Sequence, residues 1–135
     1  MAGPTAGMHR HVVIDGEVVS ENIAEHPAFR NVARTYAKLF DMQHDAAYQD
    51  ALTYTSPTTG DRVVASFQVP RTPEDLRRRR AAIRTWAEYS NGFLGRTSDY
   101  MNSSLTALSA AEKWFSQADP MFGENIRKYY EHCRE

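Results

Sequence analysis

The sequence predicts a mainly α-helical fold with two small β-hairpins. In four segments, apolar residues recur every three or four positions, which is the pattern of helices that pack through one face. Two further segments contain short β-branched or alternating runs around turn residues, as in hairpins. With 135 residues, 41% of them hydrophobic, the chain has the size and apolar content of one folded domain.

The first hairpin is predicted over residues 11–19, HVVIDGEVV. Asp15-Gly16 lies at its centre, and this pair is preferred in tight turns because both positions need a positive φ. A helix is then predicted from Pro27 to Met42, since a proline suits a first helical turn. Its apolar stripe consists of Phe29, Val32, Ala33, Tyr36 and Phe40.

The second hairpin joins Leu52–Thr55 to Arg62–Val69 through the turn-rich loop SPTTGD. The second run alternates, as in a strand with one buried face. This pattern places Ala65, Phe67 and Val69 on one face, and Ser66 and Gln68 on the other.

The clearest helix start is Thr72-Pro73-Glu74-Asp75, which combines a capping hydroxyl, a first-turn proline and acids at the positive end of the helix dipole. We expect this helix to end at Asn91-Gly92. Its apolar stripe contains Leu76, Ile83, Trp86, Ala87 and Ser90.

Two more helices are predicted, from Ser98 to Gln117 and from Pro120 onward. The chain ends inside an amphipathic pattern without a helix-ending glycine, so we expect the natural polypeptide to continue. The stripe of the first is Met101, Leu105, Leu108 and Phe115; that of the second is Phe122, Ile126, Tyr129, Tyr130 and Cys133.

Composition excludes several classes of function. The formal charge of −1 gives no overall field to attract nucleic acid or an anionic membrane. Cys133 is the only cysteine, which excludes an internal disulfide and fits a reducing cytoplasm. The five histidines lack metal-ligand spacing, so no metal site is expected, and no glycine-rich nucleotide-binding loop is present.

The run of arginines at residues 77–80 permits two interpretations. Four consecutive arginines are typical of a phosphate-binding patch, but on a helix they point about 100° apart. A solvated helix face is the simpler interpretation. Arg80 follows Leu76 by four residues and precedes Ile83 by three, so we expect its stem to lie in the buried stripe.

The segment from Asn91 to Tyr100 carries the candidate chemistry. If Thr97 or Ser98 caps the following helix, Arg96 lies at the helix entrance and Tyr100 one turn further in. A cation and a phenol then converge on one small polar ligand. The alternative is a plain helix connection in which Arg96 forms a salt bridge with Asp99 or a neighbour.

Three groups of residues carry a resemblance to a known family. They are His26–Asn31 (HPAFRN), then Asp75-Leu76-Arg77 with Arg80 and Ala82-Ile83, and Gly95-Arg96-Thr97-x-Asp99-Tyr100. From about Val13 onward, the chain resembles the N-terminal domain of the 4-hydroxyphenylacetate 3-hydroxylase family. It departs at the front, where the family has a further helical stretch.

The resemblance implies a function and a cofactor. Such enzymes use reduced FAD, supplied by a separate flavin reductase, and oxygen to hydroxylate a phenol ortho to its hydroxyl group. By position, Arg96 and Tyr100 are the implied catalytic and substrate-binding residues, which hydrogen-bond the substrate hydroxyl. The family's third partner, a histidine in an Asn-His-Ala stretch, has no counterpart here. The related hydroxyacyl-CoA dehydratases use cluster-binding cysteines in this region, so the monooxygenase branch is favoured.

The implied architecture is the N-terminal helical domain of an acyl-CoA-dehydrogenase-like fold, at residues 11–135, after a flexible N-terminus at residues 1–10. The middle β-domain and the C-terminal helical bundle, which supply most FAD contacts, are absent. We therefore expect weak flavin binding and no activity from the chain alone, and a homo-oligomer in the complete enzyme. Two alternatives are a non-catalytic helical protein-binding module and, less favoured, nucleic-acid binding through residues 77–80.

Overall fold

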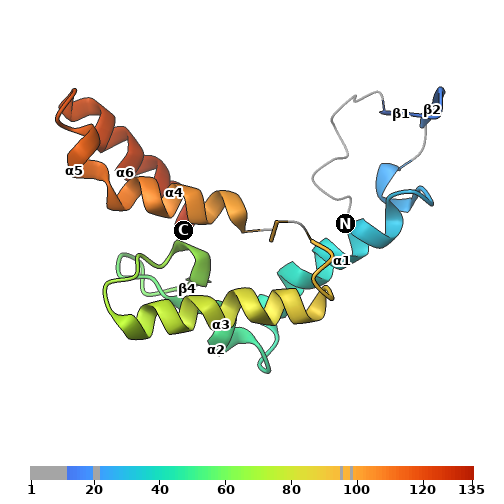
Figure 1. The fold of residues 1–135 in the computed structure, drawn as a ribbon, viewed down its shortest axis with the longest axis horizontal. Helices are drawn as coiled ribbons and strands as arrows, with labels where there is room; N and C mark the ends of the chain where they lie inside the picture. Colours follow the sequence, from blue (N-terminus) through green and yellow to red (C-terminus); the bar gives the residue numbers. More distant parts are fainter. Residues whose placement is uncertain (1–11, 20–21, 95, 98) are drawn as a thin grey trace. The chain divides into compact units, whose positions relative to one another are not determined.

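The computed structural model describes residues 12–19, 22–94, 96–97 and 99–135. The described chain is mainly helical with two separate two-stranded antiparallel sheets, which confirms the predicted fold class (Figure 1). It forms two compact units, with a boundary between Ala37 and Lys38. The described elements are β1 (Val12–Ile14), β2 (Glu17–Val19), the 3-10 turn η1 (Ile23–Glu25), α1 (Arg30–Asp41), η2 (Met42–His44), α2 (Gln49–Leu52), β3 (Thr53–Thr55), β4 (Arg62–Val64), η3 (Ala65–Phe67), α3 (Pro73–Tyr89), α4 (Tyr100–Ala110), α5 (Glu112–Phe115) and α6 (Pro120–Arg134).

The first hairpin forms as predicted. Strands β1 and β2 pair antiparallel, with Val13 opposite Val18. Asp15 and Gly16 both have positive φ, 52° and 87°, as the tight turn requires. The predicted residue His11 and the predicted N-terminus at residues 1–10 lie outside the described residues.

Helix α1 begins at Arg30, so the predicted start at Pro27 is wrong by three residues. The backbone N–H of Ala28 donates to the Nδ1 atom of His26 at 3.2 Å. Such a local bond holds the chain in a turn before the helix. The predicted stripe is also shifted at its end, since Leu39 is fully buried whereas Phe40 is exposed.

The second hairpin pairs β3 with β4, Tyr54 opposite Val63, but the predicted strand to Val69 is wrong beyond Val64. Residues 65–67 form the turn η3 and all three are buried, which an alternating strand does not allow. The backbone carbonyl of Ser66 accepts hydrogen bonds from Thr106 Oγ1 at 2.9 Å and from Arg79 at 3.2 Å. These bonds fix the turn.

Helix α3 has the predicted boundaries. The Thr72 hydroxyl accepts from the N–H of Asp75 at 3.2 Å, and the Asp75 carboxylate accepts from the N–H of Thr72 at 2.9 Å. This reciprocal pair is a capping box. At the other end, Asn91 and Gly92 adopt positive φ, 52° and 69°, and end the helix.

The predicted buried face of α3 is only half right. Trp86 and Ser90 are buried, but Leu76 and Ile83 are exposed. Arg80 is exposed, so its predicted burial is wrong, and Arg79 occupies the partly buried position instead. At this position Arg79 donates a hydrogen bond to the Ser66 carbonyl at 3.2 Å.

The predicted helix from Ser98 to Gln117 is divided, because the chain turns at Ala111 between α4 and α5. The start at Pro120 is confirmed, with the Asp119 carboxylate accepting from the N–H of Met121 at 2.8 Å. Both predicted stripes are largely wrong. Buried positions are Thr106 in α4 and Gly123, Tyr130 and Arg134 in α6, whereas Met101, Leu108, Phe122, Tyr129 and Cys133 are exposed.

The apolar core of the larger unit consists of Leu39, Met42, Leu52 and Trp86. Leu94 packs against this core. The connection between α3 and α4 is therefore anchored shortly before Arg96. Within the described residues, no helix is long and apolar enough to cross a membrane.

Candidate functional site

The two predicted site residues lie close together. Arg96 stands in the connection between α3 and α4, and Tyr100 is the first residue of α4. The guanidinium carbon of Arg96 lies 4.8 Å from the centre of the Tyr100 ring. This is a cation–π contact, which holds the cation beside the phenol.

Asp99 stabilises the start of α4 next to this pair. It is buried, and its Oδ1 atom accepts a hydrogen bond from the Thr97 hydroxyl at 2.6 Å. The backbone N–H of Tyr100 donates to the Thr97 carbonyl at 3.1 Å, and that of Ser103 to the Asp99 carbonyl at 3.0 Å. These bonds stabilise the start of α4. Along the chain, Arg96 precedes Asp99 and Tyr100 follows it.

This geometry corrects the predicted helix cap. Asp99 occupies the cap position, and the Thr97 hydroxyl binds the Asp99 side chain. Ser98, the other predicted cap, lies outside the described residues. Asp99 is buried and bound by Thr97, while Arg96 stacks on Tyr100. This contact fits both the predicted ligand site and the alternative in which Arg96 pairs with a neighbour.

The pair has the chemistry to hold a phenol oxygen. Both side chains are exposed, Tyr100 to 45%, so their polar ends are open to a ligand. A guanidinium is always charged and donates several hydrogen bonds, and a phenol hydroxyl both donates and accepts. Together they are suited to an oxygen that carries partial or full negative charge.

Sequence reasoning did not assign a role to Asp99 or Trp86 at this site. Asp99 was part of the recognised motif, and its burial is a signal that only the structure supplies. Trp86 was predicted as a core residue, which is correct, but it also borders Asp99 in a small cavity. Both residues therefore support the connection that carries Arg96.

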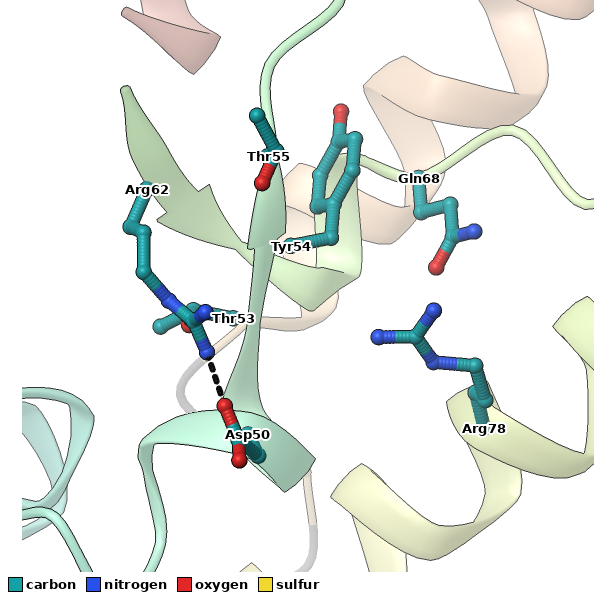
Figure 2. Close-up of a pocket in the computed structure, with 7 residues that line it drawn as sticks. All are labelled: Asp50, Thr53, Tyr54, Thr55, Arg62, Gln68 and Arg78. Atoms are coloured by element: carbon teal, nitrogen blue, oxygen red, sulfur yellow. Dashed lines mark hydrogen bonds and ion pairs between the residues drawn. The ribbon is translucent and has the colours of Figure 1, made fainter. Parts of the chain in front are cut away.

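A second, larger cavity of about 370 Å³ lies between the second hairpin and α3 (Figure 2). Arg62 is ion-paired with Asp50 there and donates to Thr53 at 2.9 Å, and Gln68 donates to Asp75 at 3.0 Å. Its lining is mainly polar. Pockets that bind aromatic ligands are lined mostly by apolar side chains. The lining is Asp50, Thr53, Tyr54, Thr55, Arg62, Gln68 and Arg78.

Metal ligation has no candidate in the ranges that the structure covers. No group of three or more His, Cys, Asp or Glu side chains there is arranged to hold a metal ion.

The described chain is thus a mainly helical domain with two small hairpins, in which Arg96 and Tyr100 lie in contact. The chain belongs to the family described as 4-hydroxyphenylacetate 3-hydroxylase N terminal, whose model matches residues 5–135.

Individual relatives agree with this assignment. The chain is 44% identical, over 92% of its length, to the oxygenase component of 4-hydroxyphenylacetate 3-monooxygenase from Geobacillus sp. (strain PA-9). It is 42% identical, over 89% of its length, to that of Thermus thermophilus. A crystal structure of such an oxygenase component with FAD and 4-hydroxyphenylacetate matches 89% of the chain, with a TM-score of 0.76 and 42% identity. In each case the chain spans only 24% of the relative's length.

Proposed function

We propose that this chain is the N-terminal, substrate-side part of an FAD-dependent two-component monooxygenase that hydroxylates a 4-hydroxyphenyl substrate ortho to its hydroxyl group. Residues 11–135 are the domain in this proposal. The observation that carries it is the Arg96–Tyr100 contact at 4.8 Å, in a chain 44% identical to a 4-hydroxyphenylacetate 3-monooxygenase component.

The two side chains bind and orient the substrate hydroxyl. Arg96 donates to the substrate oxygen and stabilises its phenolate form, because an adjacent positive charge lowers the pKa of a phenol. Tyr100 supplies a second hydrogen bond to the same oxygen. A phenolate makes the ring electron-rich at the ortho carbon, which is the position to be hydroxylated.

FAD, when bound in the complete enzyme, supplies the oxygen chemistry. In this proposal most flavin contacts come from the rest of the oxygenase, and this chain alone binds flavin weakly. A flavin reductase, the remaining domains and further copies of the oxygenase are the proposed partners, and the chain alone is inactive.

A chimera tests this proposal. Residues 12–135 replace the matching first quarter of the Thermus thermophilus oxygenase component, and hydroxylation of 4-hydroxyphenylacetate is measured with a flavin reductase. We expect Arg96→Ala to lower kcat/KM roughly ten- to hundredfold, as for the loss of a charged hydrogen bond. Tyr100→Phe should lower it by up to about tenfold.

Arg84→Ala and Tyr89→Phe are the matched controls. Arg84 is exposed on α3 and pairs with Glu88, and Tyr89 is 42% exposed, close to the value for Tyr100. Both variants should keep the chimera's activity. If the Arg96 and Tyr100 variants are as active as these controls, the proposed substrate site is wrong.

A non-catalytic protein-binding module is the second candidate, because large apolar side chains are exposed on the last three helices. Met101, Trp114 and Tyr129 are 69%, 67% and 61% exposed. A folded but inactive chimera, together with binding of an unrelated protein by these helices, would favour this candidate.

A further inference from the structure

Trp86 carries a buried polar atom without a protein partner. The residue is 3% exposed, and its indole Nε1 has no hydrogen-bond partner among the described residues. A buried donor without a partner is unfavourable, and buried tryptophan N–H groups usually find one. An unpaired indole is therefore unexpected at the centre of the core.

A small cavity lies against this indole. Its volume of about 10 Å³ is at the lower limit for one water molecule. A water also needs two to four polar partners. Beside Trp86, the cavity is lined by the polar residues Asp99 and Ser66 and by Leu52, Val64, Ala65 and Ala82.

We propose that one buried water occupies this cavity, accepts a hydrogen bond from Trp86 Nε1 and donates one to the Asp99 carboxylate. Ser66 is a third polar neighbour. The carboxylate accepts more than the one bond from Thr97, since its two oxygens offer about four lone-pair sites. The water thereby ties the connection between α3 and α4 to the core.

Trp86 is, in this arrangement, a positioning residue for the substrate site. Asp99 immediately precedes Tyr100 and accepts hydrogen bonds from Thr97 and Ser103, so a fixed Asp99 fixes the start of α4, where Tyr100 lies. Trp86 itself is held by Leu39, Met42 and Leu52. The catalytic consequence rests on the proposed function, whereas the water bridge does not.

Nuclear magnetic resonance of the 15N-labelled 135-residue chain tests the bridge directly. The chain has two tryptophans, and Trp114→Phe leaves only the Trp86 indole signal. We expect this N–H to exchange slowly with solvent, to show a cross-relaxation signal to a bound water, and to shift in Asp99→Asn. Trp114, which is 67% exposed, is the fast-exchanging reference in the unsubstituted chain. A Trp86 N–H that shows no water signal, or that is unmoved by Asp99→Asn in a folded chain, overturns the bridge.

The chimera tests the positioning role. Trp86→Phe keeps an aromatic ring but removes the donor, so we expect KM for the phenol to rise roughly threefold to tenfold, as for the loss of one hydrogen bond. Leu52→Ala changes the same cavity wall without a polar atom, so it should lower thermal stability and leave KM unchanged. Equal KM values for Trp86→Phe and the unsubstituted chimera overturn the positioning role. If the proposed function is wrong, the Arg96 and Tyr100 variants of the chimera will keep full activity, while the magnetic resonance experiment still shows the water bridge.

Discussion

Arg79 differs from its neighbours at positions 77, 78 and 80 in what it touches. Its guanidinium donates to the backbone carbonyl of Ser66 at 3.2 Å, and the residue is half-buried, whereas Arg80 is exposed. The same carbonyl accepts from Thr106, so Arg79 helps to join α3, η3 and α4.

We expect Arg79→Ala to lower the free energy of unfolding by about 1–2 kcal/mol, because it removes a charge-assisted hydrogen bond and packed methylene groups. Arg80→Ala should change it by less than about 0.5 kcal/mol, as is usual for an exposed substitution. Urea unfolding of both variants measures the difference. Equal losses would contradict the assignment of Arg79 as the packed arginine.

Tyr54 gives the fold a dependence on alkaline pH. Burial is the main cause that raises the pKa of Tyr54 well above its usual 10.0, and the neighbouring Tyr130 raises it further. The folded chain therefore keeps this phenol protonated at pH values where the unfolded chain ionises it. The stability that this provides is complete below pH 10 and falls as the pH rises above it.

Tyr54→Phe should make the free energy of unfolding fall less steeply as the pH rises above 10. It also removes the hydrogen bond from Tyr54 to the Phe67 carbonyl at 3.1 Å. Unfolding free energies measured between pH 8 and about pH 11 give the two slopes. Tyr89→Phe, at an exposed tyrosine, is the control and should keep the original slope. A Tyr54→Phe slope as steep as that of the control would show that Tyr54 does not cause the loss.

At the scale of the element, α5 and α6 approach each other closely at Gly123. A Cβ atom at this position would lie 1.9 Å from Ser116 Oγ and 2.9 Å from the Glu112 carbonyl oxygen. The side chain can move, but the carbonyl belongs to the helix backbone. Glycine is therefore required at this helix crossing although it is the poorest helix former after proline.

Gly123→Ala should destabilise the chain by about 1–3 kcal/mol, because overpacking exceeds the gain of about 1 kcal/mol in helix propensity. Adding Ser116→Ala removes one clash and leaves the one with the carbonyl, so the double variant should recover only part of the loss. Thermal unfolding of both variants measures this. A stabilised Gly123→Ala variant would show that the two helices are not in close contact.

The starts of α3 and α6 could be predicted from the sequence, whereas most of the buried helix faces could not. The capping box at Thr72 and the Asp119-Pro120 start are local signals that depend only on neighbouring residues. The buried face depends on what the rest of the chain offers, such as the Ser66 carbonyl that Arg79 meets. In α4, the buried residue is Thr106, which no apolar pattern selects.

The candidate site followed the same rule. The sequence identified Arg96 and Tyr100 through a motif, and the structure brings them together. Trp86 and Asp99 are 13 residues apart in the sequence. That both line one small cavity is known only from the structure. Both residues contribute to the site through their burial, and the spacing of residues in the sequence does not reveal burial.

At the scale of the whole molecule, the last three helices expose large apolar side chains. Met101 on α4, Trp114 on α5 and Tyr129 on α6 are each more than 60% exposed. The chain spans about a quarter of the length of its relatives. Exposed apolar faces of this kind mark surfaces that another part of a protein covers.

The remaining three quarters of the Thermus thermophilus oxygenase component should therefore stabilise this chain when added in trans. Ligands that bind only the folded state stabilise it by about 2.7 kcal/mol at a hundredfold excess over Kd. We expect the Tm of the chain to rise with the concentration of this fragment. Tyr129→Lys and Met101→Lys should weaken the effect, because each places a charge on the covered apolar face. Gln117→Lys adds the same charge at an exposed polar position and should preserve it. If all three variants respond alike, the apolar faces of α4 and α6 are not the contact surface, and docking must occur elsewhere on the chain.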